Sequence, residues 1–397
     1  MFRPDPLARP DPLARPLARP REVNVFCSLT MLSFFRRKPP SPPPEKTFKE
    51  RVAEFWSWFQ GVAPQFYAAI DAGKCADLTA ETSAEVDQLF SGFAWVYGPG
   101  ADGKGHSLTV TGEAVEHRQL LAQYWLSQAP VIPGWTFYAS RQAGPIKGHV
   151  IEMEGLRIDP KEIWVTPSID SDAKKIDLAV WHHAWDHITD HKRWTIVFLF
   201  LDEVLGEYGT KWWIGKISFG KDRLADSFPL EELAGYVANA VSSGEWKRRA
   251  PGDEWTGFTI NPSDEHYPRS DLFTLTTAAP ELFRTYMEEK DAMADLLAGS
   301  GADYVYVSID RAFFPEGQEV AKRGEIEDAL DAGLKSHNAG RLLGGGLGSE
   351  QGYIDLLIYD GARSLTLLRK ILKDLSVPTG TMIEFFARDK RARRIAI

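Results

Sequence analysis

The stretch EIWVTPSIDSDAKKIDLAVWH, residues 162–182, decides the class of fold. Apolar and polar residues alternate on both sides of a polar turn, as in two strands that each bury one face. Residues 135–141 and 149–154 carry the same period-two pattern. Residues 48–70 instead repeat large apolar side chains at helical spacing, with a kink or break expected at Gly61 and Pro64. The sequence therefore predicts an α+β protein whose mainly antiparallel sheets have helices packed on one face.

The length of 397 residues exceeds what one hydrophobic core usually supports, so two domains are expected. The polar, Gly- and Pro-containing stretch 242–269 is the expected linker between an N-terminal domain, 47–241, and a C-terminal domain, 270–397. The strands and amphipathic helices that alternate in the second domain are typical of a ferredoxin-like α/β sandwich. Residues 1–46 are expected to be a disordered, Pro-rich leader, with translation starting at Met31.

The remaining elements follow from the same periodicities. Strands are expected at 93–97, 107–111, 211–219, 272–276, 304–309, 353–359 and 382–387, and helices at 83–90, 113–128, 190–207, 230–240, 280–297, 325–336 and 365–375.

Composition limits the possible partners and the cellular location. The net charge of −9 disfavours nucleic acid or an anionic membrane as a partner. No apolar stretch approaches the ~20 residues needed to span a bilayer. Cys27 and Cys75 are too few for a disulfide framework. A cytoplasmic protein is therefore expected, and the basic run 388–394 is interpreted as a solvated tail.

His183, His187 and His191 lie at a spacing that would place three imidazoles on one face of a helix, where they could bind a metal ion. The alternation that ends at His182 favours a strand, however, and a helix is expected only from Asp190. We therefore interpret this segment as a polar turn, with no metal and no cofactor expected.

The glycine-rich stretch 340–348 resembles a phosphate-binding loop in composition. Such loops lead directly into a helix N-terminus, and a Lys-Ser/Thr pair follows the glycines. Here the next expected element is a strand that begins at Tyr353, so the stretch is interpreted as a tight connection or a β-bulge.

Asp202, Glu203 and Glu207 gather at the end of a hydrophobic helix. Paired carboxylates can perform acid–base chemistry when their environments separate their pKa values. Negative charge at a helix C-terminus is unfavourable, so a cationic partner such as Arg141 or Lys216 is expected.

Three short motifs occur in order along the chain: Phe55-Trp56-Ser57-Trp58-Phe59, Ala129-Pro130 followed by Trp135-Thr136-Phe137, and Leu201–Glu207. They resemble a family of uncharacterised bacterial proteins with an FW-x-WF helix, an AP…W-x-F strand and an LD-x-x-LGE helix. The similarity covers 48–219, and residues 340–356 resemble a region that accompanies it in some members. The resemblance implies a cytoplasmic bacterial setting and a role for the LD-x-x-LGE end, with no assigned reaction.

The sequence therefore favours a non-enzymatic protein-binding or regulatory module that uses an aromatic-rich surface, for which Trp181, Trp185 and Trp212 are the candidates. This hypothesis requires that the tryptophans 56, 58, 181, 185, 212 and 213 are not all buried. The alternative is a small-molecule hydrolase-type enzyme. It would use the carboxylates at the LD-x-x-LGE helix end together with Arg141, with His183 as a further candidate.

Overall fold

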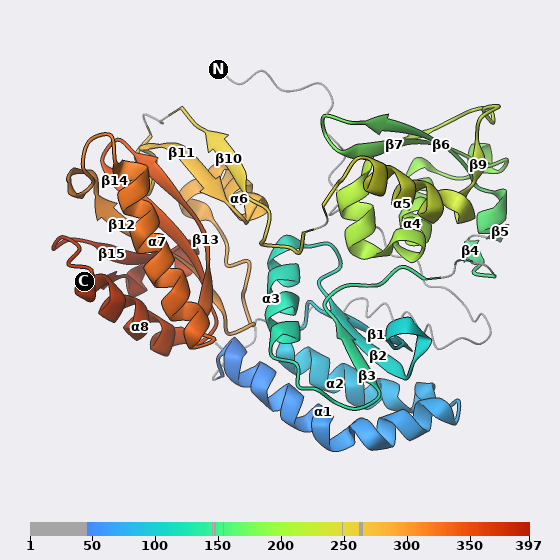
Figure 1. The fold of residues 1–397 in the computed structure, drawn as a ribbon, viewed down its shortest axis with the longest axis horizontal. Coiled ribbons are helices and arrows are strands. Elements are labelled where there is room, and N and C mark those ends of the chain that lie inside the picture. The colour runs from blue at the N-terminus through green and yellow to red at the C-terminus, as the bar shows by residue number, and fades with distance from the viewer. Residues whose placement is uncertain (1–45, 145, 147, 154, 248, 262–264) are drawn as a thin grey trace. The chain divides into compact units, whose positions relative to one another are not determined.

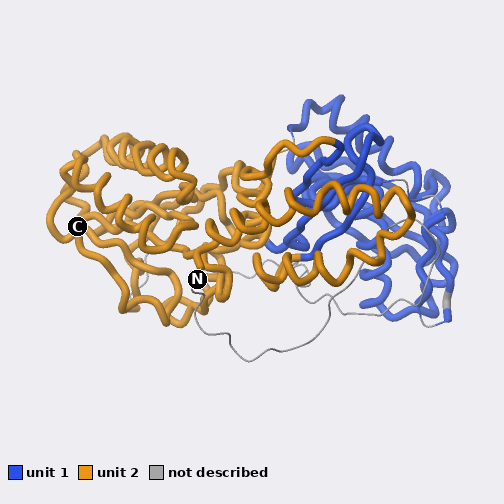
Figure 2. The backbone as a smooth tube through the Cα atoms, turned by 90° about the horizontal axis from the view of Figure 1, so that it is seen from below, with its two compact units in different colours: residues 1–36, 94–115, 134–248 blue, residues 37–93, 116–133, 249–397 orange. Residues whose placement is uncertain are grey.

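The described chain forms two compact units, each built from separate segments (Figure 2). A computed structural model describes residues 46–397 except 145, 147, 154, 248 and 262–264. The expected leader therefore lies, up to residue 45, outside the described residues. Unit 1 contains residues 94–115 and 134–248, and the described part of unit 2 contains 46–93, 116–133 and 249–397.

These units differ from the two consecutive domains expected from the sequence. The change from unit 1 to unit 2 after Arg248 does fall in the expected linker. Two earlier segments, 46–93 and 116–133, nevertheless group with the C-terminal part of the chain. Their large apolar side chains pack within unit 2, a long-range preference that local periodicity does not encode.

Helix α1 (Phe48–Asp71) of unit 2 runs through Gly61 and Pro64 as one helix, so the chain does not break at these residues. Both residues lie on the exposed side of the helix, where the missing N–H of proline disturbs no packed contact. The opposite side is the predicted apolar stripe, and it is buried from Phe48 to Phe66. At the N-terminus of α1, Thr47 Oγ1 accepts a hydrogen bond from the Glu50 amide, and Glu50 Oε2 accepts one from the Thr47 amide. This capping box fixes where α1 begins.

Helices α2 (Thr79–Leu89) and α3 (Glu116–Ser127) accompany α1 in the same unit. The indole N–H of Trp56 donates to the Trp125 carbonyl at 3.0 Å, and the two rings stack with centroids 4.6 Å apart. The FW-x-WF motif thus supplies core packing as well as a hydrogen bond between α1 and α3.

The centre of unit 2 is an antiparallel seven-stranded sheet in the order β10-β11-β13-β14-β12-β15-β16 (Figure 1). Helices α7 (Glu319–Ser336) and α8 (Gly361–Asp374) pack on one face over a core of Val, Ile, Leu and Phe side chains. The strands are β10 (Thr256–Thr259), β11 (Leu272–Thr277), β12 (Asp303–Asp310), β13 (Gly340–Gly348), β14 (Gln351–Ile358), β15 (Met382–Phe385) and β16 (Ile395–Ala396). The antiparallel sheet agrees with the predicted class. β10 lies inside the stretch expected to be only a linker.

The glycine-rich stretch forms strand β13, so its interpretation as a connection is wrong. Its glycines are required by close neighbours. A Cβ on Gly344 would lie 2.4 Å from the Thr276 carbonyl oxygen, and one on Gly345 would collide with the Glu327 carboxylate. A register shift between Leu342 and Gly344 does supply the expected bulge.

The face of this sheet opposite α7 and α8 buries Arg269. Its guanidinium nitrogen Nη1 lies 3.0 Å from Asp355 Oδ1 on β14. Burial disfavours its charge, but Asp355, together with Tyr286 and Tyr306, outweighs that effect, so the pKa of Arg269 is raised. Four aromatic rings surround the guanidinium at 4.9–5.4 Å: Tyr286 of α6 (Pro280–Glu289), Tyr306, Tyr353 and Phe386. The ion pair thus fastens the segment before β11 to the sheet.

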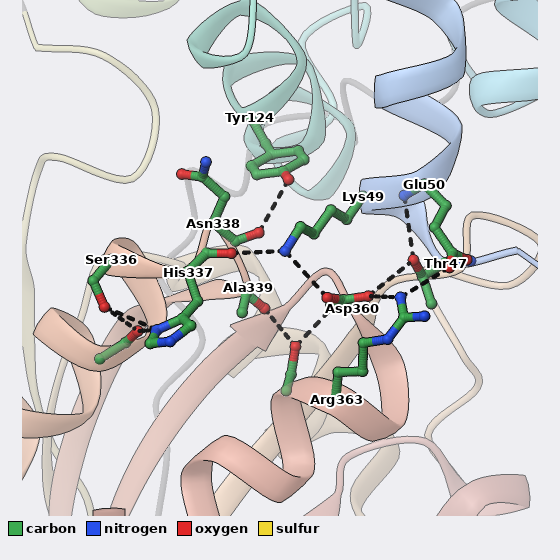
Figure 3. A network of polar contacts seen from close by, with 12 residues as sticks. Thr47, Lys49, Glu50, Tyr124, Ser336, His337, Asn338, Ala339, Asp360 and Arg363 are labelled. Atoms are coloured by element: carbon green, nitrogen blue, oxygen red, sulfur yellow. Dashed lines mark hydrogen bonds and ion pairs between the residues drawn. The ribbon is translucent and has the colours of Figure 1, made fainter.

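A polar network joins the start of α1 to the start of α8 (Figure 3). The carboxylate of Asp360, which precedes α8, lies 3.2 Å from Lys49 Nζ and 3.3 Å from Arg363 Nη1. It also accepts from Thr47 Oγ1 at 3.4 Å. The Tyr124 hydroxyl of α3 donates to the Asn338 carbonyl at 3.1 Å. Because the contacts of Thr47 and Lys49 with Asp360 connect residues more than 300 positions apart, they explain why α1 belongs to unit 2.

The basic C-terminal run is docked, which corrects its interpretation as a solvated tail. Residues Arg388–Arg393 form a 3₁₀ helix before β16. The ammonium of Lys390 lies 2.6 Å from both Asp295 and Asp303, and Arg393 lies over the Phe385 ring at 4.7 Å.

Unit 1 contains three smaller sheets. β1 (Ala94–Pro99), β2 (His106–Thr111) and β3 (Trp135–Tyr138) form one sheet, in which β2 and β3 are parallel. β4 (Ile151–Met153) and β5 (Leu156–Ile158) form an antiparallel ribbon. The third sheet contains, in spatial order, β8 (Ile214–Phe219), β7 (Lys175–Trp181), β6 (Trp164–Asp170) and β9 (Phe228–Pro229). In it, β7 and β8 are parallel. Most strand pairs in unit 1 are thus antiparallel, as expected, but two of its sheets are mixed because each contains one parallel pair.

Helices α4 (Asp190–Trp213) and α5 (Leu233–Ser243) pack on one face of the sheet β8-β7-β6-β9 (Figure 1). α4 was expected to end near Glu207. It breaks at Gly206, whose φ is +72°, and continues to Trp213. A Cβ at Gly206 would lie 2.9 Å from the Arg141 carbonyl oxygen, so the break and the close approach both require glycine.

Candidate functional site

Trp164 on β6 and Trp181 on β7 are direct cross-strand partners at one end of the four-stranded sheet. Their neighbours Val165 and Val180 are fully buried against α4 and α5. Because side chains alternate along a strand, both tryptophans lie on the opposite face. Each is partly exposed, and so is Ala179 on that face.

The segment that follows β8 packs against these tryptophans. The guanidinium carbon of Arg223 lies 3.1 Å from the centroid of the Trp164 ring, and the Trp181 indole donates to the Lys221 carbonyl at 3.1 Å. We call Trp164, Trp181 and the stacked Arg223 the tryptophan face. The stacking and the hydrogen bond hold the two indoles in place while part of each remains accessible.

The tryptophans named from the sequence occupy different environments. Trp181 belongs to the tryptophan face, whereas Trp185 is only 3% exposed and donates to the Val180 carbonyl at 3.3 Å. Trp212 is partly exposed near the end of α4. Trp56 is buried, and Trp58 and Trp213 are partly exposed, so the six are not all buried. Trp164 was missed, although its place opposite Trp181 in the alternating pattern could have identified it.

Of the three histidines considered as metal ligands, His183 lies in a cluster with two other donors. The cluster contains Glu162, His182 and His183. Each contributes one potential ligand atom, and these three atoms lie within 4.8 Å of one another. Glu162 ends the 3₁₀ turn before β6, and His182 follows β7, so strand pairing brings them together. His187 ends a separate 3₁₀ turn and His191 lies in the first turn of α4, so the three histidines do not share a helix face.

His182 is buried, while His183 and Glu162 are exposed. Burial, helped by the nearby His183, lowers the pKa of His182 to about 4. Its ring is therefore neutral at pH 7. The Nδ1 atom accepts from the Ala184 amide at 3.1 Å, so the ring proton lies on Nε2, which faces Glu162 Oε2 at 3.8 Å.

The carboxylates at the LD-x-x-LGE end lie near Arg141, as expected. Burial opposes the charge of Arg141, but the carboxylates of Glu113, Asp202, Glu207 and Glu203 together raise its pKa. The guanidinium pairs directly with Glu113, a residue that the sequence did not single out. Lys216, the other expected partner, lies on β8, where its amide donates to Asp177.

Glu207 is a buried hydrogen-bond acceptor at the break in α4. It accepts from the Thr111 hydroxyl, from the Ala114 amide at 2.8 Å and from the Arg141 amide at 3.4 Å. Ala114 has a φ of +62°, an uncommon conformation outside glycine. Glu207 thus holds the strained turn after β2 and the chain after β3 against α4, which is a structural role.

Glu203 is the more accessible carboxylate of this cluster. Its side chain is 41% exposed and lies 3.7 Å from His149 Nδ1, and its carbonyl accepts from the Gly144 amide at 2.8 Å. Asp202 is 8% exposed. Glu203 thus combines ready access to solvent with a potential proton-transfer partner.

Comparison with protein-family models, with curated proteins and with solved structures gives no match to this chain. None of the helices in the described residues is long and apolar enough to cross a membrane.

Proposed function

We propose that the protein is a non-enzymatic binding module that engages a protein partner through the tryptophan face of unit 1. The observation that carries this proposal is the cross-strand pair Trp164–Trp181, held partly exposed on the sheet face opposite α4 and α5. Tryptophan and arginine are the residue types most enriched among the energetically dominant residues of protein interfaces.

The rigidity of the face supports the same proposal. Arg223 stacks on Trp164, and the Trp181 indole is hydrogen-bonded to Lys221. Side chains that are ordered before binding lose less conformational entropy when a partner covers them. A core role alone would not place both indoles on the solvent side of a strand pair whose adjacent residues, Val165 and Val180, are fully buried.

The test is site-specific photocrosslinking of the full chain in its host. A benzoylphenylalanine at Ala179, on the same sheet face as Trp181, should give an adduct of discrete mass. The same group at Val131, which is 99% exposed in unit 2, is the control position. The adduct at Ala179 should vanish in the variant Trp164→Ala/Trp181→Ala. It should persist in Trp255→Ala, the control variant, which removes an exposed tryptophan of unit 2. Its absence, or its persistence in the double variant, would rule out the proposal.

A second candidate, a small-molecule hydrolase-type enzyme, is favoured by the gathering of carboxylates around Arg141. Glu203, beside His149, would be the general base, because Glu207 is already engaged by backbone and hydroxyl donors. Screening ester, amide and phosphate substrates tests it. Any hydrolysis must be lost in Glu203→Gln and kept in Glu232→Gln; the absence of hydrolysis removes this candidate.

A further inference from the structure

We propose that Glu162, His182 and His183 form a binding site for a divalent transition-metal ion such as Zn²⁺. Two imidazoles and a carboxylate are a donor set that suits zinc and its neighbours, and an ion held by three protein ligands keeps a further position open. The proposal is independent of the tryptophan face.

The distances are close to those that coordination needs. Tetrahedral zinc with bonds of about 2.0–2.1 Å separates its ligand atoms by roughly 3.3 Å. The donor atoms here lie within 4.8 Å of one another, and His182 Nε2 is already 3.8 Å from Glu162 Oε2. Closing the remaining gap needs only side-chain rotation of Glu162 and His183, both of which are exposed.

A second observation points to a ligand at the same place. The side chain of His182 is 1% exposed, and its Nε2 atom has no hydrogen-bond partner within the described chain. A buried polar atom without a partner is costly, and this one faces the other two donors. Zinc binding would satisfy it.

Coordination also has a defined consequence for the ring proton. A metal ion on Nε2 requires the proton to move, through solvent, to Nδ1. The Ala184 amide, which now donates to Nδ1 at 3.1 Å, then loses its acceptor. Zinc binding therefore competes with this hydrogen bond, and the Ala184 amide resonance reports directly on occupancy.

The test is zinc titration of the chelator-treated full chain by calorimetry, with the Ala184 amide followed by NMR. We expect one zinc per chain at this site and a shift of the Ala184 amide resonance. Affinity should fall at least about tenfold in Glu162→Gln and in His183→Ala, since loss of an outer-shell partner alone costs about 10–100-fold. The neighbouring variants His187→Ala and His191→Ala are matched controls and should bind within about twofold of wild type.

Circular dichroism checks that each variant is folded. The proposal is overturned if wild type binds no zinc at millimolar concentration, or if Glu162→Gln and His183→Ala bind as wild type does. It is also overturned if the two control variants weaken binding equally, or if zinc binds without a shift of the Ala184 amide.

Discussion

Trp164 and Trp181 lie directly opposite each other on antiparallel strands, while the residues beside them, Val165 and Val180, are fully buried on the other face. The strand pair therefore separates a packed core from an accessible aromatic surface within one residue step. This relationship connects the fold of unit 1 to the function proposed for it.

Acidification should destabilise the protein through His182. Its pKa is about 4 in the folded state, against about 6.5 in an unfolded chain, so below pH 6.5 the unfolded state binds the proton first. The contribution of His182 to the free energy of unfolding begins to fall as the pH drops through 6.5, and the loss is complete below pH 4. Between pH 7 and pH 5 it amounts to about 2 kcal/mol.

Urea unfolding of wild type and His182→Asn at pH 7 and pH 5 measures this effect. Asparagine keeps an acceptor for the Ala184 amide but does not titrate. The variant should therefore lose about 2 kcal/mol less than wild type on acidification. Equal losses in the two proteins would show that His182 is not held neutral by burial.

Glu207→Gln should destabilise the break in α4. The amide offers one oxygen and places an N–H₂ donor against the Thr111 hydroxyl or the backbone amides that now donate to the carboxylate. A loss of about 1–3 kcal/mol in the free energy of unfolding is expected. Glu203→Gln, at an exposed carboxylate of the same helix, should change it by less than about 0.5 kcal/mol. Similar effects of the two substitutions in urea unfolding would contradict the structural role of Glu207.

Gly344→Ala should strain the central sheet of unit 2. The added Cβ would lie 2.4 Å from the Thr276 carbonyl oxygen, and a backbone atom of a paired strand cannot rotate away. Overpacking of this kind costs about 1–3 kcal/mol. Gly257→Ala on the edge strand β10 meets nothing within 4 Å and is the matched control. Thermal unfolding of both variants checks this, and an unchanged Tm for Gly344→Ala would refute it.

Thr47→Ala should loosen the attachment of α1. The substitution removes the acceptor for the Glu50 amide and the donor to Asp360 shown in Figure 3. Loss of an N-cap side chain costs about 0.5–2 kcal/mol. Hydrogen exchange should accelerate in the first turn of α1, whereas Thr47→Ser, which keeps the hydroxyl, should exchange like wild type. Unchanged exchange in Thr47→Ala would show that the cap contributes little.

Much of the local structure was predictable because it follows from periodicity. The alternation in 162–182 predicted β6 and β7, and the apolar stripe after Thr47 predicted α1. Elements that depend on distant partners were not predictable. Gly340–Gly348 is a strand because its glycines let β11 and the side chains of α7 approach closely, and those neighbours are remote in sequence.

The candidate sites show the same division. Arg141 was expected beside the carboxylates of the LD-x-x-LGE motif because negative charge there needs a cation. His182 and Glu162 were missed as partners of His183, since only the pairing of β6 with β7 brings them together. Helical spacing had instead pointed to His187 and His191, which the 3₁₀ turn and the start of α4 keep apart from the cluster.

The most direct test of the central claim is the affinity of the crosslinked partner, once purified, for wild type and for single tryptophan variants. Calorimetry should show at least about tenfold weaker binding for Trp164→Ala and for Trp181→Ala, as expected for dominant interface residues. Trp255→Ala should bind like wild type. Binding of both tryptophan-face variants within about twofold of wild type would contradict the proposed function.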